Sequence, residues 1–337
     1  MHGFFSGRET VGEILERRRR QTAERIGELR LELKDAEALC SKTACVYMTG
    51  SFSRGEANSH SDLDLFIVGK AGDGKRALGG LNEILIKSDL VRATRKLGIP
   101  DFSGEGEYLT HYTVEEIVDT LGKPEDDVNN TFTARLLLLL ESRPLIGDEI
   151  YREVIPSVVQ AYCKDYQDHA SEFVPGFLAN DILRMWRTFC VNYEARTQSA
   201  PPAKKAKRRL KNFKLKHSRL LTCYSALLYL LALFLRNKTV SPDDISSMVA
   251  LTPTERIEWL SRQSGICTAS SKMEELLALY EDFLIRTDAS EDELVKRFMD
   301  EAKRREYFES ASRFGDLVFE VLQSFGGGNR FHRLLVV

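Results

Sequence analysis

The stretch VYMTGSFSRGEANSHSDLDLFIV, residues 46–68, contains two short apolar runs separated by a polar spacer. Both runs are rich in β-branched and aromatic residues and are bounded by turn residues, which predicts two buried strands. The first run ends in Gly50 and Ser51, and Asp62 and Asp64 open the second. The pattern therefore places a glycine–serine turn and a pair of carboxylates at the ends of two core strands.

The two aspartates are expected to point the same way, because side chains at i and i+2 share one face of a strand. Carboxylates held side by side repel each other, and a divalent cation between them would remove that repulsion. Oxygen ligands suit Mg²⁺ or Mn²⁺. Gly50 would let the backbone approach a ligand closely, and the hydroxyl and N–H of Ser51 suit phosphate oxygens. We therefore expect a metal and phosphate site, with Asp62 and Asp64 as metal ligands.

Gly-Ser, a ten-residue spacer and then Asp-x-Asp between apolar residues resembles the DNA polymerase β nucleotidyltransferase superfamily. The resemblance implies an α+β fold, in which a small mixed-sheet core is followed by an all-α helical domain. We expect these domains to span residues 1–128, with an N-terminal helix, and residues 129–337. The resemblance also implies an enzyme that uses two metal ions to transfer NMP from an NTP to a hydroxyl and releases pyrophosphate. Asp62 and Asp64 would bind both metals, and Gly50 and Ser51 would hold the β- and γ-phosphates.

Members of this superfamily carry a third catalytic carboxylate, also a metal ligand, on a later strand near the attacking hydroxyl. Asp101 is the first candidate, because it follows a helix stop and begins the return towards the sheet. Glu107 heads the next predicted strand and is the second candidate, and Glu105, Asp126 and Asp127 are further alternatives. If none of them reaches the metals, the chain would be a non-catalytic nucleotide- or RNA-binding member of the same fold.

A strongly basic helix is predicted over residues 204–219, and residues 195–242 contain twelve Lys or Arg and no acidic residue. The remainder of the chain has an acidic excess, so the formal net charge is only −2. A basic segment on an acidic protein is typical of an anionic partner. The resemblance implies that lysines of the second domain reach the triphosphate, and Lys211 and Lys214 are the candidates. The other cations either bind RNA or are solvated.

Three acceptors are compatible with the sequence. An RNA end suits the basic helix. A protein side chain is suggested because residues 139–148, LLESRPLIGD, are similar to segments that follow the core in protein-modifying members. The pattern Gly-Ser-Phe…Ser-Asp-x-Asp-Leu is also similar to that of the bacterial cyclic oligonucleotide synthases of the antiviral type, so a cyclic second messenger is the alternative product.

The chain from residue 129 onward is predicted to be almost entirely helical. Its longest apolar stretch, residues 220–235, has 16 residues, fewer than the roughly 20 of a membrane span, so we expect a buried helix and no membrane contact. The six cysteines are scattered without a Cys-x-x-Cys pattern, which is typical of a reduced cytoplasmic protein. The predicted helices cover residues 10–40, 149–168, 175–196, 205–236, 242–250, 254–262, 270–287 and 291–325.

Overall fold

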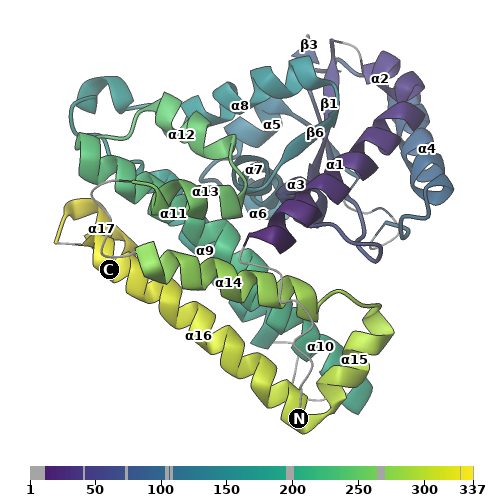
Figure 1. Ribbon diagram of the computed structural model, residues 1–337. Coiled ribbons are helices and arrows are strands. Elements are labelled where there is room, and N and C mark those ends of the chain that lie inside the picture. Colours follow the sequence, from purple (N-terminus) through teal and green to yellow (C-terminus); the bar gives the residue numbers. More distant parts are fainter. Residues whose placement is uncertain are drawn as a thin grey trace.

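The computed structural model describes residues 12–40, 42–72, 75–102, 106, 109–194, 201–263, 270–326 and 328–336 (Figure 1). The first part of the chain contains a small mixed sheet flanked by helices, and the remainder is almost wholly helical. This arrangement confirms the α+β class expected from the sequence.

The central sheet has four strands in the order β5-β2-β1-β6. Strand β1 pairs antiparallel with both β2 and β6, whereas β2 pairs in parallel with β5. The last of these strands lies beyond residue 128, so the sheet takes an edge strand from the part of the chain assigned above to the helical domain. The strands are β1 (Ala44–Thr49), β2 (Asp64–Gly69), β5 (His111–Thr113) and β6 (Arg143–Ile146), with a separate hairpin of β3 (Ala71–Gly72) and β4 (Lys75–Arg76).

Alternate side chains of the strands enter two different cores, as the period of a strand requires. On one face, Val46 and Ile67 share a core with residues of α1 (Glu13–Glu32), α2 (Lys34–Cys40) and α4 (Gly80–Lys96). On the other face, Tyr47 and Phe66 stack on each other and pack with α5, α7 and α8. Figure 1 shows the two helical layers on either side of the sheet. The second layer comprises α5 (Val114–Asp119), α7 (Thr131–Leu140) and α8 (Asp148–Tyr162).

The N-terminal helix differs from the single helix predicted over residues 10–40. It is divided at Leu33, whose backbone leaves the helical region (φ −103°, ψ 17°) while its side chain is fully buried. The start of α1 is capped from the far end of the chain, because the Glu281 carboxylate accepts hydrogen bonds from Gly12 N at 2.9 Å and Leu15 N at 3.1 Å. This contact ties the first helix to the C-terminal part of the chain.

A continuous helix, Pro202–Asn237, runs through the helical part and contains the basic helix in its first half. It is long and apolar enough to cross a membrane, but 78% of its most apolar window is buried inside the molecule.

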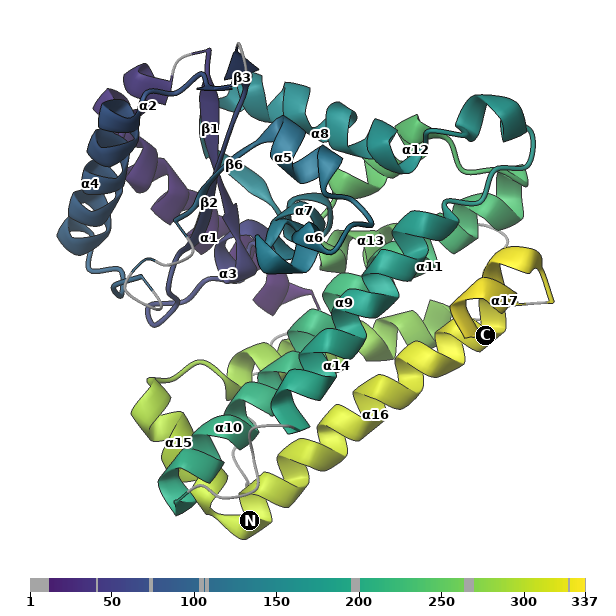
Figure 2. The same cartoon turned by 180° about the vertical axis from the view of Figure 1, so that it is seen from behind.

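Seen from behind, α10 and α15 lie next to each other at one end, and α16 runs along the length of the helical part (Figure 2). The predicted helix over residues 291–325 is interrupted at Asp300, which is extended. The remaining helices are α3 (Gly50–Arg54), α6 (Glu125–Val128), α9 (Gly176–Glu194), α10 (Pro202–Lys214), α11 (Leu220–Asn237), α12 (Pro242–Val249), α13 (Pro253–Ser261), α14 (Ser270–Arg286), α15 (Glu291–Met299), α16 (Glu301–Gly326) and α17 (Arg330–Val336).

Candidate functional site

The turn after β1 lies against the start of β2. Thr49 is the register partner of Asp64, so Gly50 follows directly beside the aspartate. Gly50 has φ +70°, and a Cβ at this position would lie 2.7 Å from Oδ2 of Asp64. Glycine is therefore required twice, once for its backbone conformation and once for the space that the carboxylate occupies.

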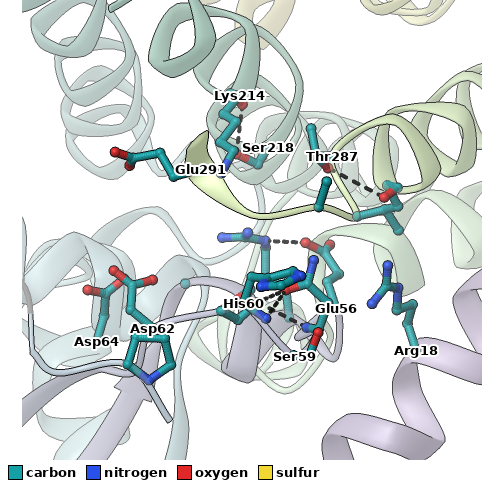
Figure 3. A pocket seen from close by; sticks show the side chains of 18 of the residues that line it. Arg18, Glu56, Ser59, His60, Asp62, Asp64, Lys214, Ser218, Thr287 and Glu291 are labelled. Atoms are coloured by element: carbon teal, nitrogen blue, oxygen red, sulfur yellow. Dashed lines mark hydrogen bonds and ion pairs between the residues drawn. The ribbon is translucent and has the colours of Figure 1, made fainter. Parts of the chain in front are cut away.

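Asp62 and Asp64 present their carboxylates side by side at the edge of a cleft (Figure 3). The sequence pattern predicts both on a strand, but β2 begins at Asp64, and Asp62 belongs to the loop immediately before it. Leu63 between them is buried, as the alternation predicts. Burial raises the pKa of Asp64, and the neighbouring Asp62 raises it further. The structure thus brings the two predicted metal ligands together, although their carboxylates repel each other.

The cleft has a volume of about 560 Å³ and takes its walls from both halves of the chain. The turn at Gly50 and Ser51 and the two aspartates form one wall, and the long helix and the segment between α14 and α15 form the other. Residues more than 150 positions apart in the sequence therefore face one ligand-sized space. Its lining comprises Arg18, Gly50, Ser51, Arg54, Glu56, Asn58, Ser59, His60, Ser61, Asp62, Asp64, Pro100, Asp101, Lys214, Ser218, Arg219, Phe283, Leu284, Thr287, Ala289, Ser290 and Glu291.

A π-helical segment, Leu215–Arg219, sits in the long helix at the point where it borders the cleft. Its wider turn lets Ser218 and Arg219 line the cleft together with Lys214. His217 is fully buried and is not among the lining residues; its ring is stacked on Phe283 with ring centroids 4.6 Å apart. Burial lowers the pKa of His217 to about 4, so it is a neutral packed side chain near pH 7. Single-turn π segments are frequent at functional sites, and no sequence pattern indicates this one.

Glu141, at the end of α7, connects the two walls beneath the cleft. Its buried carboxylate accepts hydrogen bonds from Arg54 Nη1 at 2.9 Å and from Thr222 Oγ1 at 2.7 Å, and it also pairs with Arg219. Gly50 N donates to the same carboxylate at 3.3 Å. Removing Glu141 would leave two guanidinium groups without this counter-charge. The carboxylate therefore holds the glycine turn, Arg54 and Arg219 in a fixed arrangement.

Lys214 is exposed but borders the cleft, where desolvation lowers the pKa of this lysine and the negative charge of Asp62 opposes the shift. Lys211 lies one turn earlier in α10 on an exposed part of the helix and is not among the lining residues. The positive charge of the basic helix is partly neutralised within the protein, because the acidic start of α15 packs against this helix. Lys207 forms an ion pair with Glu291 at 2.5 Å.

The candidates for a third carboxylate are placed very differently. Asp101 is at the rim of the cleft, 71% exposed in its side chain and 3.1 Å from Arg95. Asp126 is buried in an ion pair with Arg135, and Asp127 pairs with Arg184, both outside the cleft lining. Glu105 and Glu107 lie outside the residues that the structure describes. Asp101 is thus the candidate that the described residues place at the cleft.

The donor set at the cleft fits a hard divalent cation. In the described part of the chain, no group of three or more His, Cys, Asp or Glu side chains is arranged to hold a metal ion. Two adjacent carboxylates with a nearby hydroxyl are, however, what Mg²⁺ commonly uses, since it keeps water and ligand oxygens in its other positions. Asp62 and Asp64 can therefore hold such an ion together with oxygens of a bound ligand.

Residues 27–130 match the family described as the nucleotidyltransferase domain. No curated protein and no solved structure matches the chain. The matched region contains the glycine–serine turn, both aspartates and Asp101. It excludes the cleft residues of the N-terminal and C-terminal helices, among them Arg18, Lys214 and Arg219.

Proposed function

Residues 27–130 form a nucleotidyltransferase domain of the polymerase β-like superfamily, and from this premise we propose that the cleft binds an NTP and transfers its NMP to a hydroxyl acceptor, with release of pyrophosphate. Enzymes with this domain are transferases of phosphorus-containing groups. The observation that carries the proposal is the pair Asp62 and Asp64 on one wall, facing a cleft whose other wall supplies Lys214 and Arg219.

The triphosphate would lie between these walls. Ser51 offers its hydroxyl and N–H to phosphate oxygens. Lys214 supplies a mobile point charge, and Arg219 supplies a planar set of donors that Glu141 already orients. These contacts would hold the β- and γ-phosphates while the α-phosphate lies at the aspartate pair. Lys211 is the second lysine that we propose to contact the triphosphate.

The carboxylates of Asp62 and Asp64 would hold Mg²⁺ or Mn²⁺. When bound, the metal neutralises charge that develops on the transferring phosphate and makes the attacking hydroxyl more acidic. Asp62 and Asp64 then fix the reacting phosphate relative to Gly50 and Ser51. Asp101, at the rim, is proposed as the third carboxylate, a further metal ligand that orients the attacking hydroxyl and accepts its proton.

The acceptor in this proposal is the terminal hydroxyl of an RNA. The support is the placement of the basic helix, whose last cation in α10, Lys214, lines the cleft while Lys204 and Lys211, earlier in the same helix, are exposed. Cations in such a row would hold the backbone phosphates of a strand whose end enters the cleft.

The proposal is tested by incubating the protein with Mg²⁺ and each of the four NTPs, labelled at the α- or the γ-phosphate, with and without total RNA. Support consists of α-label in RNA together with γ-label in pyrophosphate, both absent in the Asp64→Asn variant. α-Label on protein, or in a small cyclic product, would retain nucleotidyl transfer and replace the RNA acceptor. Transfer of the γ-label, or no NTP binding at all, would overturn the proposal.

A further inference from the structure

A second hollow, of about 260 Å³, lies between α9, the long helix Pro202–Asn237 and α16. No described residue lines both this hollow and the cleft. Phe319 is 59% exposed although it belongs to the walls, and large apolar side chains left exposed around a hollow are typical of a binding site. We call this space the α16 hollow, and its walls include Trp186, Lys216, Leu220, Tyr224, Gly315 and Phe319.

The walls of the α16 hollow combine aromatic rings with one positive charge. Trp186 and Tyr224 form a T-shaped pair with ring centroids 6.3 Å apart. Lys216 is the one charged residue among the described residues of the walls. Within the described part of the chain it forms no ion pair, and its ammonium group lies 5.6 Å from the centre of the Phe308 ring. A ligand with a flat apolar body and an anionic group complements these walls.

Gly315 keeps the α16 hollow open. It lies inside α16, where glycine is less favourable than other residues. A Cβ at this position would meet no atom within 4 Å, so close packing does not require glycine here. The volume is below the roughly 300–1,000 Å³ of pockets for drug-sized ligands, which favours a ligand of one or two rings.

The long helix contributes to both spaces across its π-helical segment, Leu215–Arg219. The cleft takes Lys214, just before this segment, and Arg219 at its end. The α16 hollow takes Lys216 inside the segment and Tyr224 beyond it. Conversion of the wide turn to a regular α-helix would rotate the residues before it by about 100° relative to those after it. Each space therefore keeps its walls only while the π-helical turn is present.

We propose that the α16 hollow is a regulatory binding site for a small aromatic acid, whose ring packs against Trp186 and Tyr224 and whose anionic group pairs with Lys216. The acid and the nucleotide both make contacts across the π-helical segment, so each stabilises the helix geometry that the other needs. Ligands that favour the same conformation bind cooperatively, and the coupling is equal in both directions. Occupation of the hollow accordingly strengthens NTP binding. This regulatory effect, unlike the binding of the acid, rests on the proposed function of the cleft.

The probe for the site is 1-naphthoate, a two-ring aromatic carboxylate, and 1-naphthamide is its uncharged counterpart of similar shape. Calorimetric titration of the full chain should give a dissociation constant of about 1 mM or below for naphthoate. Naphthamide should bind about tenfold more weakly. Lys216→Met removes the charge and keeps the length of the side chain, so it should reduce the affinity for naphthoate to that for naphthamide. Gly315→Leu should abolish the binding of both, because the leucine side chain would fill the hollow.

Gly27→Leu is the matched control. Gly27 is also a glycine inside a helix with no atom within 4 Å of a Cβ, but it lies in α1 and does not line the hollow. This variant should bind naphthoate as the unmodified protein does. The site would be overturned by an absence of naphthoate binding up to about 10 mM, by equal affinities for naphthoate and naphthamide, or by unchanged binding in Gly315→Leu. If Gly315→Leu does not fold, unchanged binding in Lys216→Met overturns the site.

The regulatory effect is measured with α,β-imido NTP analogues, which resist transfer. In the presence of Mg²⁺, saturating naphthoate should strengthen analogue binding about fivefold or more in the unmodified protein and in Gly27→Leu, and have no effect in Gly315→Leu. An analogue affinity that naphthoate leaves unchanged or weakens would overturn the regulatory effect. A protein that binds naphthoate but no NTP analogue would instead contradict the proposed function of the cleft.

Discussion

Gly50 and Asp64 are packed so closely that any side chain at position 50 would place its Cβ 2.7 Å from a carboxylate oxygen of Asp64. The contact follows from the antiparallel register of β1 and β2, in which Thr49 lies opposite Asp64. A ligand that approaches the backbone at Gly50 is thereby brought beside the carboxylate. The phosphate-binding turn and the metal-binding carboxylate of the proposed site are consequently one rigid unit.

Asp64→Asn is expected to raise the melting temperature of the protein in the absence of divalent metal. The folded chain holds the Asp64 proton more tightly than the unfolded chain does, since burial and Asp62 raise its pKa. Stability is therefore lost as pH rises from the unfolded-chain value of 3.8 through the raised folded value, and the variant escapes this loss. The rise in melting temperature of Asp64→Asn should be absent below the unfolded-chain pKa of Asp64. It should be complete above the raised pKa of Asp64 in the folded chain. Thermal unfolding between about pH 3 and pH 8 measures it.

Magnesium is expected to change the difference in melting temperature between the unmodified protein and Asp64→Asn. If Asp62 and Asp64 hold the ion, Mg²⁺ should raise the melting temperature of the unmodified protein and have little effect on Asp64→Asn. Equal stabilisation of both proteins by Mg²⁺ would place the metal elsewhere. A lower melting temperature of the metal-free variant above the titration window would contradict the repulsion between the two carboxylates.

Lys214→Ala should weaken NTP binding about tenfold or more in the absence of an acceptor, because a charge-assisted contact is worth roughly 1.5–3 kcal/mol. Lys211→Ala is the matched comparison, on the same helix but outside the cleft lining, and its effect on NTP affinity should be smaller. Equilibrium binding of a fluorescent NTP analogue measures both. Affinities equal to that of the unmodified protein in both variants would remove the lysines from the triphosphate site.

Asp101→Asn is expected to reduce turnover strongly with little change in NTP affinity, since the proposed partner of Asp101 is the attacking hydroxyl. Its position is exposed and beside Arg95, so the substitution should leave the stability of the fold unchanged, and Arg95→Ala controls for the broken ion pair. Steady-state kinetics separate the two parameters. If Asp101→Asn is fully active and Glu107→Gln is not, the third carboxylate is Glu107.

The basic helix is tested through its salt dependence. Replacing Lys204, Lys205 and Arg208 by Ala should leave NTP binding unchanged and flatten the dependence of RNA binding on salt, by about one unit of log–log slope for each phosphate that is no longer neutralised. Filter binding of a short RNA between about 50 and 300 mM salt measures the slope. An unchanged slope would mean that these cations are solvated and that RNA is not the acceptor.

The part of the site that could be predicted from the sequence is the part encoded locally. Gly50, Ser51, Asp62 and Asp64 lie within 15 positions of one another, and the strands that carry them have clear apolar patterns. Two strands and a turn fix their relative placement, so spacing alone was informative. Lys214 is a candidate because it lies in a run of cations and because the family resemblance implies lysines of the second domain at the triphosphate.

The remaining parts depend on contacts between distant segments. In the sequence Glu141 is only an acid at the end of an apolar helix, and the tertiary fold brings Arg54 of α3 and Arg219 of the π-helical segment to its carboxylate. Arg18 is one of four consecutive arginines, with nothing local to mark it as buried. The π-helical turn that directs Arg219 to the cleft has no sequence signature. Such features arise from the tertiary fold and therefore cannot be predicted from sequence patterns.

The central claim, that Asp62 and Asp64 act as one metal site for nucleotidyl transfer, is tested most directly by the rate of pyrophosphate release in Asp62→Asn, Asp64→Asn and the double variant. Loss of several kcal/mol of transition-state stabilisation predicts at least a roughly hundredfold decrease in each single variant. The double variant should be hardly slower than either single variant, because residues that act as a unit are not additive. A single variant that keeps the unmodified rate, or losses that multiply in the double variant, would contradict the account.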